Sequence, residues 1–287
     1  MEVEIGLGKK ARQAYGFDDI AIVPSRRTRD PDDVDIGWKL GDHLLELPLL
    51  ASAMDGVVSP RTAIEIGKLG GLGVLNLEGI FSRYAKADEQ LERIAKLSPS
   101  EATRGMQKIY SRPVDPELIG RRVREIKDGG VLAACALTPQ RVEEYYPIAR
   151  EAGLDVLVIQ GTVVSAEHVS ANGGALNLKE FIASLDIPVI VGGCASYHGA
   201  LHLMRTGAEG VLVGVGPGAA CTTRGVLGVG VPQATAIADA SAARAQHLLD
   251  TSRYVNVIAD GGMRTGGPQS WSSCSHAVLP IPNCWRF

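Results

Sequence analysis

Seven short apolar segments recur along the chain, with stretches that have the pattern of amphipathic helices between them. They cover residues 49–54, 71–77, 131–137, 155–160, 188–192, 210–216 and 255–262. The segments are hydrophobic almost throughout rather than at alternate positions, which is typical of parallel strands buried on both faces. The pattern therefore predicts a parallel sheet built from repeated strand–helix units.

Signals for helix starts and helix ends agree with this pattern. A polar residue followed by proline predicts an N-cap and a first helical turn, and a glycine after a periodic segment predicts a C-cap. These signals occur at Asp115-Pro116, Thr138-Pro139, Gly153 and Gly207. The helices expected after the two prolines cover residues 117–127 and 141–152.

Seven strand–helix units favour an α/β fold of the (β/α)8 TIM-barrel type over an open doubly wound sheet, which usually has about five or six strands. The open sheet remains an alternative. We expect one catalytic domain over residues 1–267, a barrel that is incomplete after its seventh strand. Residues 268–287 hold two of the three tryptophans and no helix or strand periodicity, and we hypothesise that a frameshift produced them.

Composition limits the classes of partner. A net charge of −3 and a pI near 6.1 provide no basic surface for nucleic acid. No stretch reaches the roughly 18 apolar residues of a membrane span, and the start of the chain lacks a signal-peptide pattern. We therefore expect a cytoplasmic protein that binds a small molecule, with neither a membrane nor a nucleic-acid partner.

The five cysteines form no CxxC pair and suggest neither a disulfide framework nor a zinc site. Cys135 and Cys194 lie in or just after apolar strands and are predicted to be small buried hydrophobic residues. Cys221 differs because it follows a glycine-rich loop and precedes two threonines and an arginine. A nearby cation or helix start can stabilise a thiolate, so Cys221 is the candidate nucleophile.

The same loop loosely matches a dinucleotide-binding fingerprint. The match consists of Gly214, Gly216 and Ala219, followed about 20 residues later by Asp239. Asp239 falls inside an alanine-rich helical stretch rather than after a second strand, and Pro217 interrupts the loop. A Rossmann-type dehydrogenase is therefore the weakest of the alternatives.

The loop over residues 214–224 resembles the signature of the IMP dehydrogenase and GMP reductase family. It reads Gly-x-Gly-Pro-Gly-x-x-Cys-Thr-Thr-Arg, which is highly specific. The resemblance covers nearly all of residues 10–267, through segments 16–24, 53–55, 70–73, 228–233 and 259–267. It implies a β/α barrel in which a cysteine thiolate attacks C2 of a purine nucleotide.

The resemblance implies one of two reactions. In the dehydrogenase the hydride passes to NAD and the adduct is hydrolysed to XMP, whereas in the reductase ammonia leaves GMP and NADPH supplies the hydride. We expect an IMP dehydrogenase-like enzyme that uses NAD and K+, and a homotetramer or larger oligomer. GMP reductase and a catalytically impaired nucleotide-binding homologue remain alternatives.

The resemblance also implies the residues of the site. Cys221 would be the nucleophile and Thr223 its hydroxyl partner in proton handling. The nucleotide is expected at Ser52, Met54, Asp260, Gly261 and Gly262, where Asp260 would hold the ribose hydroxyls and Gly262 the phosphate. The cofactor is expected at Gln160, Gly161, Thr162 and Gly193. The carbonyl oxygens of Gly216, Gly218 and Cys221 would bind K+.

The chain departs from the family pattern at several positions. Ala219 stands where the family usually has a phosphate-binding serine, and Gln160 stands where it has an aspartate that holds the cofactor ribose. Paired regulatory domains are absent after the second strand. The place of the family's flap and water-activating residues lies beyond residue 267, and we expect this chain to have none of them. Two residues also have simpler interpretations, since Met54 could fill the core and Asp260 could cap a helix.

Overall fold

The computed structural model describes residues 2–23, 30–164, 176–219 and 221–264. The chain folds into two compact units. One unit comprises Met1–Gly37, Thr162–Ala166 and Gly192–Phe287, and the other comprises Trp38–Gly161 and Glu167–Val191. We call them the thiol unit, which contains Cys221, and the Met54 unit, and describe each by itself.

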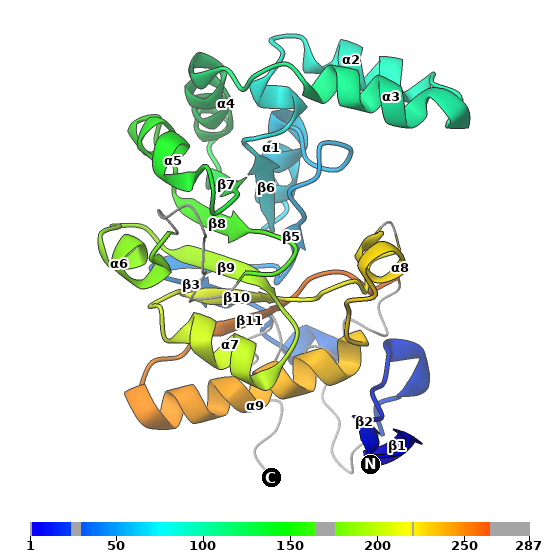
Figure 1. Cartoon of the computed structure of the whole chain (residues 1–287). Helices are drawn as coiled ribbons and strands as arrows, with labels where there is room; N and C mark the ends of the chain where they lie inside the picture. Colours follow the sequence, from blue (N-terminus) through cyan, green and yellow to red (C-terminus); the bar gives the residue numbers. More distant parts are fainter. Residues whose placement is uncertain (1, 24–29, 165–175, 220, 265–287) are drawn as a thin grey trace. The chain divides into compact units, whose positions relative to one another are not determined.

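The Met54 unit begins with a hairpin and continues with alternating strands and helices (Figure 1). Its elements are β3 (Trp38–Leu40), β4 (His43–Leu45), β5 (Leu50–Ala51), α1 (Pro60–Lys68), β6 (Leu72–Asn76), η3 (Ile80–Ser82), α2 (Ala87–Ala95), α3 (Pro99–Tyr110), α4 (Pro116–Asp128), β7 (Ala134–Leu137), α5 (Val142–Glu151), β8 (Val156–Gln160), α6 (Leu178–Ala183) and the start of β9 (Val189–Cys194).

The thiol unit holds an N-terminal hairpin, the end of β9 and the last strands and helices of the described chain (Figure 1). Its elements are β1 (Glu2–Gly6), β2 (Lys9–Arg12), η1 (Phe17–Asp19), η2 (Pro31–Asp33), α7 (Tyr197–Met204), β10 (Gly210–Val213), α8 (Thr223–Leu227), α9 (Gln233–Thr251) and β11 (Asn256–Ala259). Helix α9 packs against α7 and β11.

The strands of the large sheet follow the order β5-β6-β7-β8-β9-β10-β11, the same as their order along the chain. The pairs β5–β6, β6–β7, β7–β8 and β10–β11 are parallel. A doubly wound sheet reverses its strand order at a switch point, whereas a TIM barrel does not. The predicted α/β barrel class is thereby confirmed, and the described residues form seven strands of an incomplete barrel.

Burial explains why these strands lack alternation. Every residue of β7 and β10 is buried, and so are the first four residues of β8. Both faces of the sheet are covered, so an apolar side chain is favoured at each position. The buried set in the Met54 unit includes Leu75, Leu157 and Ile159, each with no exposed surface.

Two of the helix-start predictions have different outcomes. Asp115 is the N-cap of α4, where its side chain accepts a hydrogen bond from the N–H of Glu117 at 3.0 Å. The prediction for Thr138 was wrong, because α5 begins only at Val142 with Arg141 as its N-cap. The N–H of Thr138 instead donates to Glu78 Oε1 at 2.6 Å, which draws the end of β7 toward the end of β6.

The β3–β4 hairpin was not expected from the strand pattern. It buries Trp38, Leu40 and Leu45, and the indole N–H of Trp38 donates to the carbonyl oxygen of Leu47 at 3.1 Å. The β1–β2 hairpin is exposed along almost its whole length. Among the described helices, none has the length and apolar character that a membrane span needs.

Candidate active site around Cys221

Cys221 lies between β10 and α8, in a tight turn of the glycine-rich loop. Its N–H donates to the carbonyl oxygen of Gly218 at 3.1 Å, and Thr223, two residues later, begins α8. The residue is exposed, whereas Cys135 and Cys194 are buried, as expected for those two positions. The loop thus presents one accessible thiol at the carboxyl end of a buried strand, where barrel enzymes carry their chemistry.

The surroundings of the thiol favour its ionised form. Hydrogen bonds from the hydroxyl and the backbone N–H of Thr223 lower the pKa of Cys221, and the backbone N–H of Gly216 adds to this effect. Slight desolvation and the negative charge of Asp260 oppose the shift, but the pKa remains below its ordinary value. A thiolate is the nucleophilic form of cysteine, so these donors activate the side chain.

The segment after β11 packs on the cysteine loop. A Cβ placed on Gly261 would lie 3.3 Å from the Cα of Gly218, and one on Gly262 would lie 3.1 Å from the Cβ of Pro217. Both glycines have positive φ, at 83° and 79°. The structure therefore brings the predicted nucleotide residues Gly261 and Gly262, together with Asp260, beside the loop that carries Cys221.

Two predicted cofactor residues also reach this loop. A Cβ on Gly193 would lie 2.7 Å from the carbonyl oxygen of Gly214 and 3.6 Å from that of Thr162. The carbonyl oxygen of Gly193 accepts a hydrogen bond from the N–H of Val164 at 3.1 Å. Thr162 and Gly193 therefore lie at the base of the loop, close to Gly214.

A pocket of about 540 Å³ is lined in part by Gly216 and Pro217 of the loop. This volume is in the usual range for small-molecule sites. The side chains around it include two cations and two carboxylates, and the lining comprises Ala14, Gly16, Phe17, Asp18, Asp19, Gly216, Pro217, Arg224, Val231, Pro232, Gln233, Gly262 and Arg264. The N-terminal part of this lining was not among the predicted site residues, although its Gly-Phe-Asp-Asp motif is part of the family resemblance.

Hydrogen bonds and one ion pair hold the N-terminal segment against α9, beside this pocket. The N–H of Tyr15 donates to Thr235 Oγ1 at 2.8 Å, and the N–H of Thr235 donates back to the carbonyl oxygen of Tyr15 at 3.2 Å. The guanidinium of Arg12 pairs with both carboxylate oxygens of Asp239 at 3.0 Å. Asp239 thus anchors the N-terminal segment to α9. Since its carboxylate is paired with Arg12, Asp239 does not take the ribose-binding role that the Rossmann alternative would give it.

The remaining predicted residues belong to the Met54 unit. Ser52 and Met54 follow β5, and Gln160 and Gly161 stand at the end of β8. The side chain of Met54 is 49% exposed, so the alternative that it fills the core is wrong. All four lie at carboxyl ends of strands, as a barrel active site requires.

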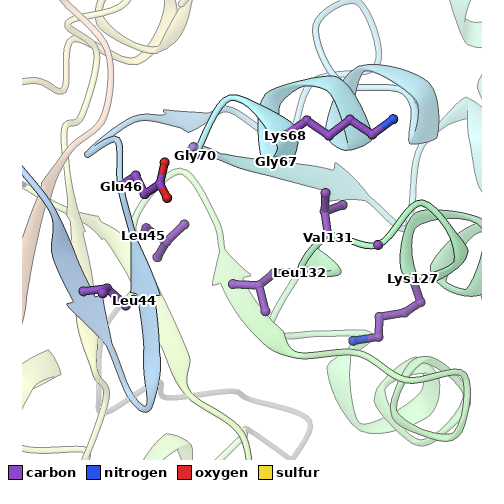
Figure 2. A pocket seen from close by; sticks show the side chains of 11 residues that line it. Leu44, Leu45, Glu46, Gly67, Lys68, Gly70, Lys127, Val131 and Leu132 are labelled. Atoms are coloured by element: carbon purple, nitrogen blue, oxygen red, sulfur yellow. The ribbon is translucent and has the colours of Figure 1, made fainter.

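The Met54 unit also has a pocket of about 560 Å³ at the opposite strand ends. Figure 2 shows Leu44, Leu45 and Glu46 on one side and Val131 and Leu132 on the other. The lining segments precede β6 and β7, so the pocket opens at the amino ends of these strands. The chemistry of TIM barrels occurs at the carboxyl ends, which excludes this pocket from the candidate active site.

No cluster of three or more histidine, cysteine or acidic side chains with metal-binding geometry occurs in the described part of the chain. The predicted K+ site is of another kind, since Gly216, Gly218 and Cys221 would contribute carbonyl oxygens. Such oxygens are the ligands that hard cations prefer. Gly218 O already accepts the N–H of Cys221, and a carbonyl oxygen has a second lone pair for a cation.

Comparison with known proteins agrees with this geometry. The family model described as IMP dehydrogenase / GMP reductase domain matches residues 14–272. An uncharacterized oxidoreductase of Mycolicibacterium smegmatis is 48% identical over 272 residues, which cover 92% of this chain and 72% of the relative. An inosine-5'-monophosphate dehydrogenase of Cryptosporidium parvum is 31% identical over 274 residues, which cover 90% of this chain and 64% of that enzyme.

A solved structure is also closely similar. The crystal structure of an IMP dehydrogenase/GMP reductase-like protein from Corynebacterium glutamicum matches with a TM-score of 0.90 and 44% sequence identity. The match covers 96% of this chain and 74% of that one. Sequence, fold and the geometry around Cys221 lead to one conclusion: the chain belongs to the IMP dehydrogenase / GMP reductase family of oxidoreductases.

Proposed function

We propose that this chain is an IMP dehydrogenase-like oxidoreductase that forms a covalent adduct between Cys221 and C2 of a purine ribonucleotide. The observation that carries the proposal is the exposed thiol with a lowered pKa, within electrostatic reach of Asp260 and on a loop that packs against Gly261 and Gly262. A nucleophile needs both access and activation, and Cys221 has both. The other two described cysteines have neither, because burial raises the pKa of Cys135 and, to about 12, that of Cys194.

The polar groups near Cys221 suit the parts of a nucleotide. The carboxylate of Asp260 can accept hydrogen bonds from two vicinal ribose hydroxyls. Gly262 has no side chain to keep a phosphate from its N–H, and Arg224 and Arg264 line the adjoining pocket with positive charge. We assign Gly261 to the same site, and the assignment of Ser52 and Met54 rests on their sequence motif.

The proposed reaction is balanced by a cofactor and water. The Cys221 sulfur would bond to C2 of IMP, the hydride on C2 would be removed by the bound cofactor, and water would then displace the sulfur to give XMP and a proton. Thr223 donates to the sulfur, and its hydroxyl would exchange a proton with the water. NAD supplies the hydride acceptor when bound.

The residues proposed for the cofactor fit a group rich in hydroxyls and amides. Gln160 has an amide that can both donate and accept, and Thr162 has a hydroxyl. Gly161 and Gly193 would let the ligand approach the backbone. K+ at Gly216, Gly218 and Cys221 would fix the loop conformation, and a homo-oligomer is part of the proposal by resemblance.

Trapping the nucleophile tests the proposal. The full chain is incubated with 6-chloropurine ribonucleotide, from which a thiolate can displace chloride, and tryptic peptides are analysed by mass spectrometry. We expect the adduct on the peptide that contains Cys221 and its loss in Cys221→Ser. A modified Cys135 or Cys194, or no adduct at all, would contradict the assigned nucleophile.

The direction of the reaction requires a separate assay. We expect IMP to support reduction of NAD, followed by absorbance at 340 nm. Oxidation of NADPH with GMP, without the first activity, would establish the GMP reductase alternative. Adduct formation without either turnover would instead favour the nucleotide-binding homologue.

A further inference from the structure

The loop that follows β5 is fastened by the carboxylate of Asp55, the residue directly after Met54. Asp55 Oδ2 accepts a hydrogen bond from the N–H of Ile80 at 3.0 Å and another from the hydroxyl of Tyr110 at 2.5 Å. The first donor begins η3, and the second is the last residue of α3. Two segments remote from β5 in the sequence therefore hold this loop.

The carboxylate is packed directly on Gly79. A Cβ at this glycine would lie 1.9 Å from Asp55 Oδ1 and 2.6 Å from its Cγ, so no other residue type fits. Oδ1 is buried and has no hydrogen-bond partner among the described residues. An unsatisfied buried oxygen is costly. The two hydrogen bonds to Oδ2 are thus the contacts that keep the carboxylate in place.

The end of α3 is itself fixed, so the Tyr110 hydroxyl has a defined position. Tyr84 donates its hydroxyl to the carbonyl oxygen of Ile109 at 2.9 Å, and Arg83 donates to the carbonyl oxygen of Arg112. Burial, together with the bond to Asp55, raises the pKa of Tyr110. The phenol therefore stays protonated at neutral pH and remains a donor.

Asp55 controls the backbone that carries Met54. The carbonyl oxygen of Met54 accepts the N–H groups of Val57 and Val58 at 2.8 and 2.9 Å, and the N–H of Met54 donates to the carbonyl oxygen of Ser52 at 2.7 Å. This is a compact turn with Asp55 inside it. The peptide group between Met54 and Asp55 belongs to this turn, so the contacts of the Asp55 carboxylate anchor the turn that contains Met54.

From this geometry we infer that Tyr110 is a positioning residue for the nucleotide, acting through Asp55 on the loop from Ser52 to Met54. Helices α2 and α3 form a hairpin in the connection between β6 and α4 (Figure 1). Through Tyr110, this hairpin would hold the loop after β5 in position. The inference rests on the proposed nucleotide-binding function of Ser52 and Met54. Tyr110 takes no part in the chemistry.

The test compares two variants that each lose one hydroxyl. Tyr110→Phe removes the donor to Asp55, whereas Tyr254→Phe removes a hydroxyl that bonds Arg244 and contacts neither Asp55 nor α3. Each is assayed as the full chain for IMP binding by calorimetry and for amide hydrogen exchange over residues 52–58. We expect Tyr110→Phe to weaken IMP binding about tenfold and to speed exchange at Val57 and Val58 by a similar factor.

The control should behave as the wild type in both measurements, with the melting temperatures of the two variants within about 2 °C of each other. Equal binding and equal exchange in both variants would overturn the inference. So would weaker binding in Tyr110→Phe without faster exchange, because the effect would then bypass the loop. Faster exchange in Tyr110→Phe, when the wild type binds no purine nucleotide, would refute the proposed function and leave the loop contact established.

Discussion

Gly214, which follows β10, lies against the backbone of Asp260, which follows β11. A Cβ on Gly214 would stand 2.1 Å from the carbonyl oxygen of Asp260, far inside any real contact distance. The N–H of Asp260 donates to the carbonyl oxygen of Val213 at 2.8 Å and fixes the two segments at this separation. The cysteine loop and the proposed ribose carboxylate are therefore held together by backbone packing.

Replacing this glycine should separate the two segments. We expect Gly214→Ala to lower the free energy of unfolding by about 2 to 4 kcal/mol, because backbone atoms on both sides must shift. Urea denaturation followed by circular dichroism measures the change. Gly225→Ala is the matched control, since a Cβ there meets nothing within 4 Å, and it should change stability by less than about 1 kcal/mol. Equal effects of the two substitutions would contradict the packing argument.

The activation of Cys221 can be measured through its reaction with iodoacetamide. Since the donors of Thr223 lower its pKa, the thiol should stay reactive at a pH where an ordinary cysteine is mostly protonated. Thr223→Val removes the hydroxyl donor and should slow alkylation several-fold at pH 7, with the rates converging above the ordinary cysteine pKa. Thr223→Ser keeps a hydroxyl and should retain most of the rate.

Peptide-resolved mass spectrometry assigns the rate to Cys221 alone. The buried thiols of Cys135 and Cys194, whose pKa values burial raises, should remain unmodified in the folded protein. A pH profile that is identical in Thr223→Val and the wild type would show that the hydroxyl does not stabilise the thiolate.

Ala219 offers a gain-of-affinity prediction. It is exposed in the cysteine loop, two residues before the nucleophile, where the family usually has a phosphate-binding serine. Ala219→Ser should tighten IMP binding by about three- to tenfold, the net value of one ordinary hydrogen bond. Ala219→Val adds bulk without a hydroxyl and should bind no tighter than the wild type. Calorimetric titration with IMP separates these outcomes.

His247 should make the stability of the fold depend on pH. Its ring is buried in α9, and neither ring nitrogen has a hydrogen-bond partner among the described residues. Burial, with the positive charges of Arg253 and Arg205, lowers the pKa of His247. The unfolded chain therefore takes up this proton at a higher pH than the folded protein does.

The sign follows from that difference. Stability from the neutral ring is complete above about pH 6.5 and is lost as the pH falls from there toward the folded pKa. The slope is at most about 1.4 kcal/mol per pH unit. His247→Leu should remove this component, so denaturation curves at pH 7.5 and 5.5 should differ less in the variant. An unchanged difference would exclude His247 as its source.

The sequence predicted the strands well because their burial requires an unbroken apolar pattern. The segment expected over 155–160 is β8 (Val156–Gln160), and the one expected over 188–192 lies in β9 (Val189–Cys194). Helices α2 and α3 were not predicted. They bury few side chains, Ala87 in α2 and Ile109 in α3, and they lie outside the repeated strand–helix pattern from which the other helices were predicted.

The site was predictable only as a set of motifs. The cysteine loop and the Asp-Gly-Gly segment are recognisable because their residue types are unusual, but nothing in the sequence gives the approach of Gly261 to Gly218. The contribution of the N-terminal segment depends on its hydrogen bonds with Thr235, more than two hundred residues away. Likewise, the contact of Tyr110 with Asp55 arises from tertiary packing, which local patterns do not encode.

The residues around Cys221 follow or end β9, β10 and β11, the last three strands of the sheet in sequence order. Gly193, Gly214 and Asp260 must all be in place before the loop can take its final form, and loop closure between distant segments is slow. Chain collapse and helix formation should therefore precede the appearance of the reactive thiol. In a refolding experiment, the rate at which Cys221 gains its reactivity would time the last step of maturation, separately from the recovery of secondary structure.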